Sequence, residues 1–421
     1  MDKTPLFTND AVVLGVLMLS LGFIFYSSNL KSGFWSQFYK VVPAVLMCYL
    51  IPAIFNSLGI ISDSSSNLYF VASRYFLPAS LVLMTLSIDL KAIKNLGYKA
   101  LVMFATGTVG IVIGGPIAIL LISLFSPETV GGAGPDAVWR GLSTLAGSWI
   151  GGGANQAAML EIFKYNPEKY GGMVLVDIVV ANLWLAIILL GIGKSDKIDK
   201  WLNADNTAIE DLKEKMSSYT KSVSRKPELK DYMIMLGIAF TAVGFSHWAS
   251  DYISDFLISN FEIFNDKTSS LASFTSTFFW MITIATAFGV GLSFTKAKSY
   301  EGTGASQLGS VFIYFLVATI GMKMDLTTIF ENPGLILIGI VWMSIHAGLL
   351  ILVAKLIKAP YFFLAVGSQA NVGGAATAPI VASAFHPSLT SVGVLLAVFG
   401  YIVGTYAAIG CTILMEISSN L

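Results

Sequence analysis

The sequence predicts an all-α polytopic membrane protein, and its composition is the main reason. Of the 421 residues, 55% are hydrophobic and 12% are charged, and the mean hydropathy is +0.74. Soluble domains carry about 25% charged residues, so a water-exposed surface could not be covered here. The formal net charge is +0, which leaves no basic field to attract nucleic acid. The expected partners are the lipid bilayer and a small-molecule substrate.

Ten apolar stretches are candidates for membrane spans, because a helix needs about 20 mostly apolar residues to cross the hydrocarbon core. Two further segments, 143–163 and 362–385, are apolar but rich in Gly, Ala, Asn, Gln and Ser. The ten predicted spans are residues 11–27, 41–60, 69–88, 100–125, 172–193, 231–249, 272–294, 308–324, 335–354 and 390–415.

The distribution of lysine and arginine predicts that both Gly-rich segments are re-entrant, entering and leaving on one side. In that topology 18 of these 25 residues lie on one side and 5 on the other, whereas two full crossings give about 15 against 8. Cytoplasmic loops carry the positive excess. We therefore expect both termini outside and the charged loop 194–230 in the cytoplasm, in the cytoplasmic (inner) membrane of a bacterium.

The two halves of the chain resemble each other. Tyr75-Phe-Leu-Pro-Ala-Ser matches Tyr314-Phe-Leu-Val-Ala-Thr, and Gly152-Gly-Ala matches Gly373-Gly-Ala. Five spans per half is an odd number, so corresponding elements would lie in opposite orientations. The sequence thus predicts two inverted-topology repeats, 1–193 and 231–421, joined by the loop 194–230. Many secondary transporters have this architecture, with their sites where the repeats meet.

The Gly-rich segments are the candidate substrate site. Glycine permits a sharp break in a helix, and the half-helix ends at such a break present unpaired N–H or carbonyl groups to a ligand. The alternative is that small residues let helices pack closely and the amides hold them together. The candidate substrate-binding residues are Ser148, Gly152, Gly153, Asn155, Gln156, Ser368, Gln369, Asn371, Gly373, Gly374 and Thr377.

Asp177 is the candidate site for a coupling ion, with Asn182 beside it in the sequence. Asp177 stands about five residues inside an apolar run, where a carboxylate is costly and usually functional. We expect it to hold Na⁺ or a proton. The alternative is a carboxylate near the interface that is simply hydrated.

Other ionisable residues favour structural roles. We expect Arg74, Asp89, Lys323 and Asp325 to form ion pairs or to anchor helices at the interface. For His346, in the middle of a span, a hydrogen-bonded core position is favoured over a proton relay.

No enzymatic motif is present. The sequence has no GxxxxGK[ST] loop and no HExxH, and its two cysteines, Cys48 and Cys411, lie in separate apolar segments. We therefore expect a protein that is not an enzyme and has no cofactor other than Na⁺ as a coupling ion.

The segments Gly147–Gln156 and Gly367–Pro379, with their flanking spans, resemble the YjcL-type family of uncharacterised bacterial and plastid membrane proteins. That family is grouped with the cation/proton antiporter and anion transporter superfamily, alongside bile-acid and glutamate symporters. The resemblance implies a transport domain that moves past a scaffold, coupled to Na⁺ or H⁺, in a homodimer.

The sequence therefore favours an ion-coupled secondary transporter of elevator type. Its substrate would be a small polar solute bearing a carboxylate, such as an amino acid, a short peptide or an organic acid. A cation/proton antiporter without an organic substrate is the alternative, and a receptor that uses the transporter fold for binding alone is a third class.

Overall fold

A computed structural model describes residues 5–39, 42, 44–86, 93–94, 96–205, 207, 209, 212, 226–261, 275–324, 332–386 and 389–421. Every regular element in these ranges is helical. Seven of the described helices are long and apolar enough to span a membrane. An eighth span is added if α15 (Thr277–Ser293) and η6 (Lys296–Thr303), bent by 97°, are counted as one. The prediction of an all-helical, multi-pass membrane protein is confirmed.

Each of the ten predicted spans overlaps a described helix, and the span at 69–88 comprises three consecutive helical elements. Three other spans are matched by helices of fewer than 18 residues: α3 (Ala44–Ser57), α15 and α16 (Ala305–Gly321). The remaining helices are α1 (Asp10–Ser28), α2 (Gly33–Phe38), α3 (Ala44–Ser57), α4 (Leu68–Val71), η2 (Ala72–Phe76), α5 (Leu77–Leu86), α7 (Tyr98–Ser123), α8 (Pro127–Val130), α9 (Val138–Gly151), α10 (Gly153–Phe163), α11 (Tyr170–Ile192), α12 (Ser195–Leu202), α14 (Leu229–Asn260), α16 (Ala305–Gly321), α17 (Gly334–Leu356), α18 (Tyr361–Val372), α19 (Gly374–Phe385) and α20 (Thr390–Ser419).

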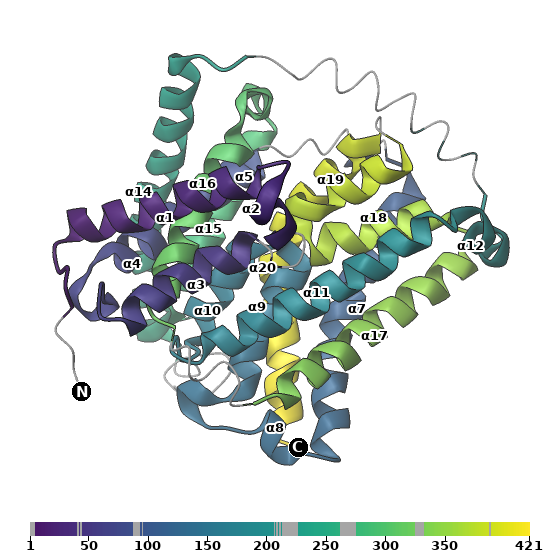
Figure 1. The fold of residues 1–421 in the computed structure, drawn as a ribbon, viewed down its shortest axis with the longest axis horizontal. Coiled ribbons are helices and arrows are strands. Elements are labelled where there is room, and N and C mark those ends of the chain that lie inside the picture. The colour runs from purple at the N-terminus through teal and green to yellow at the C-terminus, as the bar shows by residue number, and fades with distance from the viewer. Residues whose placement is uncertain are drawn as a thin grey trace.

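The helices form two groups (Figure 1). In the first, which we call the flanking bundle, α5 packs against α14, α15 and α16, and α1 and α3 pack on α16. In the second, the hairpin bundle, α20 packs against α7, α9, α18 and α19, and α17 packs against α7 and α11. Each bundle draws helices from both halves of the chain, so neither predicted repeat is a separate packing unit.

The first Gly-rich segment is a helical hairpin. Gly152 separates α9 from α10 with φ +76°, a backbone conformation that favours glycine. The Arg140 guanidinium, near the start of α9, donates a 2.6 Å hydrogen bond to the carbonyl of Phe163, the last residue of α10. Continuous helix would put these two residues roughly 35 Å apart. The chain therefore turns back at Gly152, and the two ends of the hairpin lie next to each other at the end remote from Gly152.

The second Gly-rich segment folds back in the same way at Gly373 and Gly374, the latter with φ +54°. The rings of Phe362, at the start of α18, and Phe385, at the end of α19, have their centroids 5.3 Å apart. Both segments thus have the re-entrant shape that the positive-charge distribution predicts.

The two hairpins open at opposite ends of α11. Gly141, at the open end of the first hairpin, lies against Met173 near the start of α11. At the other end of α11, the Tyr361 hydroxyl from the second hairpin donates to the Ile188 carbonyl at 2.9 Å. The hairpins consequently point toward each other and their tips meet. A Cβ placed on Gly374 would lie 3.9 Å from the Cα of Gly152.

The segment that follows α11 is anchored at the open end of the second hairpin. The Asp199 carboxylate accepts from the backbone N–H of Tyr361 at 2.7 Å, which caps the first turn of α18. The ammonium of Lys99 donates to the Asp205 carboxylate at 3.0 Å and to the Lys358 carbonyl at 3.2 Å. Hydrogen bonds from Thr207 and Lys99 lower the pKa of Asp205 to about 2, so this contact is formed with an ionised carboxylate.

Candidate functional site

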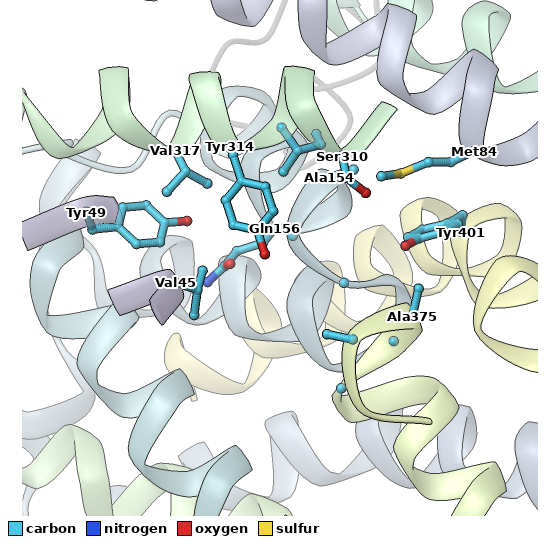
Figure 2. Close-up of a pocket in the computed structure, with 16 residues that line it drawn as sticks. Val45, Tyr49, Met84, Ala154, Gln156, Ser310, Tyr314, Val317, Ala375 and Tyr401 are labelled. Carbon is cyan, nitrogen blue, oxygen red and sulfur yellow. The ribbon is translucent and has the colours of Figure 1, made fainter. Parts of the chain in front are cut away.

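A cavity of about 310 Å³ lies where the two hairpin tips meet the flanking bundle (Figure 2). Its volume lies at the lower end of the range for small-molecule sites, and such sites combine apolar walls with a few polar groups. The flanking bundle contributes Val45, Tyr49, Met84, Ser310, Ile313, Tyr314 and Val317, and the hairpin bundle contributes Gly152, Gly153, Ala154, Gln156, Gly373, Gly374, Ala375, Ala376 and Tyr401.

Uncommitted hydrogen-bonding groups face this cavity. The hydroxyls of Tyr314 and Tyr401 make no hydrogen bond with the described residues, and neither does Oε1 of Gln156. The helices α10 and α19 both begin at the hairpin tips, without a side-chain cap. Their first N–H groups have no intrahelical partner and carry the positive end of the helix dipole. The described lining residues include no charged side chain.

The predicted substrate-binding residues divide into two sets. Gly152, Gly153, Gln156, Gly373 and Gly374 line the cavity. The others are packed behind its wall, where they bond to other parts of the protein; they are Ser148, Asn155, Ser368, Gln369, Asn371 and Thr377.

Asn155 and Asn371 connect the hairpins to long helices. The Asn155 amide donates to the Gly151 carbonyl at 2.9 Å, and its oxygen accepts from the hydroxyl of Thr405 on α20. The Asn371 amide donates to the Phe104 carbonyl at 3.0 Å, and its oxygen accepts from Thr108 on α7 at 2.7 Å. Both side chains are fully buried. These contacts are the interhelical hydrogen bonding that the packing alternative describes.

Gln369 lies directly behind the tip of the second hairpin. Its Oε1 accepts from the Thr377 hydroxyl at 2.6 Å, which joins α18 to α19. Its Nε2 is buried and has no hydrogen-bond partner among the residues that the structure describes. A buried amide donor without a partner is costly, so this group is available to a ligand or a rearranged tip.

Asp177 links α11 to both arms of the first hairpin. One carboxylate oxygen accepts from Trp149 Nε1 at 2.7 Å, and the other accepts from the Ser148 hydroxyl at 2.8 Å and from Gln156 Nε2 at 3.0 Å. Gln156 therefore touches Asp177 with its nitrogen and faces the cavity with its oxygen. Asn182 is not part of this cluster, because it is exposed and donates to the carbonyl of Ile178 in its own helix at 2.7 Å.

His346 is a hydrogen-bonded core residue. Its Nδ1 contacts the Gly107 carbonyl at 3.0 Å, so Nδ1 is the donor. Its Nε2 then accepts from the Ser368 hydroxyl at 2.8 Å, and that hydroxyl accepts from Trp184 Nε1 at 2.7 Å. A neutral imidazole satisfies every bond in this chain.

Charged residues cluster where the first hairpin meets the flanking bundle. Glu161 of α10 accepts from Arg74 Nη1 at 2.9 Å and from the Tyr69 hydroxyl. Lys323 places its Nζ 3.6 Å from the centroid of the Tyr69 ring. Arg74 thus forms a structural ion pair, and it stands in the π-helical turn η2, an irregularity often found at functional sites. Asp89 and Asp325 lie outside the described residues.

Sequence reasoning missed four residues of this region. Glu161 could have been found, because it is a carboxylate within the apolar run Ala157–Phe163 and carries the same cost as Asp177. Nothing in the sequence distinguishes Tyr49, Tyr314 and Tyr401 from tyrosines that only pack between helices. They stand in ordinary spans, where aromatic residues also serve packing and interfacial belts.

Within the described ranges, no three His, Cys, Asp or Glu side chains gather as a ligand set for a metal ion. A cation at Asp177 would therefore take its other ligands from hydroxyl, amide or backbone oxygens. The Ser148 hydroxyl is near enough to supply one of them, and the Gln156 amide would have to turn its oxygen toward Asp177 to supply another.

The helices, hairpins and cavity define a multi-pass membrane protein. The chain belongs to the family described as "Protein of unknown function (DUF819)", which it matches over residues 15–417. It is similar to the "Uncharacterized membrane protein YjcL" of Bacillus subtilis (strain 168), with 25% identity over 369 residues that cover 84% of this chain and 85% of that protein.

Proposed function

We propose that this protein is an ion-coupled secondary transporter for a small polar organic solute that bears a carboxylate. The observation that carries the proposal is the cavity between the two bundles, where the tips of two hairpins meet. Broken helical backbone at membrane depth is tolerated where it is buried in protein or lines a water-filled cavity. Transporter sites are built from such breaks near the membrane midplane.

We propose an elevator mechanism, in which the hairpin bundle moves relative to the flanking bundle. The division of the helices supports this. Each bundle takes equivalent elements from both halves, namely α1, α3 and α5 with α14, α15 and α16, and α7 to α11 with α17 to α20. This is the arrangement that two inverted five-span repeats would produce. The cavity is lined by both groups, so relative motion would change its access.

Asp177 is the proposed coupling site, for Na⁺ or H⁺. Its contact with Gln156, which also lines the cavity, provides a direct connection between ion and solute. Ion binding at the carboxylate would change the position or orientation of the Gln156 amide. That change would alter the solute's affinity by the same factor by which the solute alters the ion's affinity.

We further propose a homodimer in the bacterial cytoplasmic membrane, with both termini outside and the 194–230 loop in the cytoplasm. The positive-charge distribution supports this orientation. The Lys99, Asp205 and Lys358 contacts are also consistent with it, because all three residues belong to connections predicted to be cytoplasmic.

Thermal stabilisation of the purified protein tests the proposal. Amino acids, dipeptides and organic acids are each added in Na⁺ or K⁺ buffer, and the unfolding midpoint is recorded. A ligand at 100 times its Kd adds about 2.7 kcal/mol to the stability of the folded state. We expect a solute that stabilises the protein more in Na⁺ or at one pH. If Na⁺ or pH alone shifts the midpoint and no solute adds to it, the function is cation/proton antiport.

A further inference from the structure

We infer that the cavity takes a compact α-amino or α-hydroxy monocarboxylate with an apolar side chain, and that it rejects di- and tricarboxylates. This inference rests on the proposed function and narrows its substrate class. Three independent features of the cavity carry it: its lack of charge, the free oxygen of Gln156 and the apolar wall of the flanking bundle.

The first feature limits the ligand to one carboxylate. The described lining contains no lysine, arginine or histidine, so no side-chain cation is present to neutralise an anion. The first N–H groups of α10 and α19, helices of 11 and 12 residues, converge at the tips and can hold one carboxylate. A second carboxylate would be buried without a partner, which carries a large desolvation cost.

The second feature requires a donor on the ligand. Gln156 is 4% exposed, and its Nε2 is committed to Asp177 at 3.0 Å. Its Oε1 has no partner among the described residues and lies at the cavity beside Tyr314, as Figure 2 shows. A carbonyl oxygen can only accept a hydrogen bond, and a bound ligand would cover this one. An ammonium or hydroxyl group next to the ligand's carboxylate would satisfy it.

The third feature, the apolar wall of the flanking bundle, determines which side chain the ligand carries. Facing the tips, α3, α5 and α16 contribute the aliphatic side chains of Val45, Met84, Ile313 and Val317. Burying an apolar group of the ligand against this wall is favourable by about 25 cal/mol per Å². With about 310 Å³ available, the ligand is the size of a single branched or aromatic amino acid.

The test is a matched series of probes measured by thermal stabilisation and by isothermal titration with the full-length protein in detergent. L-Leucine and 2-hydroxy-4-methylpentanoate each carry a single carboxylate, an α-donor and an apolar side chain, which match the three features of the cavity. 4-Methylpentanoate lacks the α-donor, 3-methylbutylamine lacks the carboxylate, and glutamate and succinate carry a second carboxylate. We expect the first two to bind at least tenfold more tightly than each of the other four.

A variant separates the role of Gln156 from general cavity fit. Gln156→Met keeps the length of the side chain and removes the acceptor together with the Nε2 donor to Asp177. The lost Asp177 contact affects both ligands alike, so the ratio of their affinities measures the loss of the acceptor: leucine and 4-methylpentanoate should then bind equally. Ser344→Ala, an exposed change on α17, is the matched control and should keep the tenfold preference. Unfolding midpoints without ligand show whether each variant is folded.

Three results overturn the inference. If glutamate or succinate binds more tightly than leucine, or if 4-methylpentanoate binds as well as leucine, the assigned class is wrong while carboxylate transport stands. If no member of the series binds, the inference fails. If the wider solute screen is then also negative, the proposed function fails with it.

Discussion

At the scale of single residues, the polar side chains of the hairpin bundle are fixed by specific partners. Asp177 accepts three hydrogen bonds, and His346 lies in a chain that ends at the Gly107 carbonyl. Because these groups are buried and bonded, they hold the hairpins in one arrangement. At the cavity, by contrast, the hydroxyls of Tyr314 and Tyr401 and Oε1 of Gln156 have no partner among the described residues.

The Glu161–Arg74 pair should contribute to stability, because it joins the two bundles in a partly buried place. Its side chains are 16% and 30% exposed, whereas those of the Asp136–Lys169 pair are 42% and 38% exposed. Losing one partner costs roughly 0–1 kcal/mol at the surface and roughly 3–5 kcal/mol when buried. We expect Glu161→Gln to lower the unfolding midpoint more than Asp136→Asn does. Equal shifts of the unfolding midpoint in a thermal unfolding assay would show that the Glu161–Arg74 pair stabilises the fold no more than the exposed Asp136–Lys169 pair does.

Residue positions were predictable from sequence only where cost or geometry singles out one residue type. Asp177 was identified because a carboxylate in an apolar run is expensive, and Gly152 and Gly374 because a sharp break needs φ > 0. The roles of Asn155 and Asn371 could not be predicted. The same amide can face a ligand or another helix, and only the fold decides.

At the scale of elements, close helix contact is achieved by glycine. A Cβ on Gly404 of α20 would lie 2.6 Å from the Cα of Gly151 and 2.7 Å from Nδ2 of Asn155. Neither neighbour can yield easily, because one is backbone and the other is hydrogen-bonded. This contact packs the tip of the first hairpin directly against α20.

Gly404→Ala should therefore destabilise the protein, whereas Gly410→Ala on the same helix should not. Overpacking typically costs about 1–3 kcal/mol, and a Cβ on Gly410 meets nothing within 4 Å. Alanine at an open helix position is even favoured over glycine. Thermal unfolding of the two variants measures the difference. A tolerated Gly404→Ala would mean that the hairpin tip is not held by this contact.

The elements themselves were largely predictable from sequence. Hydropathy located the spans because length and apolar character are set by the bilayer, and positive charge indicated the fold-back of both Gly-rich segments. The break within the third predicted span, the π-helical turn η2, was not predicted. Its residues, Ala72–Phe76, contain neither Gly nor Pro, but Pro78 has no N–H to donate to the Arg74 carbonyl, and that missing bond is the signal that could have located the turn.

At the scale of the whole molecule, two hairpins that open at opposite ends of α11 meet at one cavity between two bundles. The correspondence of the two halves stays a prediction from the sequence repeat. The grouping of the helices into a flanking and a hairpin bundle could not be predicted, because it depends on contacts between spans far apart in the chain. The proposed transport mechanism therefore depends on a membrane topology in which two re-entrant hairpins oppose each other.

Sided cysteine labelling measures this topology. In a background without Cys48 and Cys411, single cysteines replace Ala133 and Glu168, which flank the first hairpin, or Lys358 and His386, which flank the second; all four are exposed. Intact cells and permeabilised cells are treated with a membrane-impermeant maleimide. We expect positions 133 and 168 to react in intact cells, and positions 358 and 386 to react only after permeabilisation. Labelling of the two ends of either hairpin from opposite faces would show that the segment crosses the membrane and is not re-entrant.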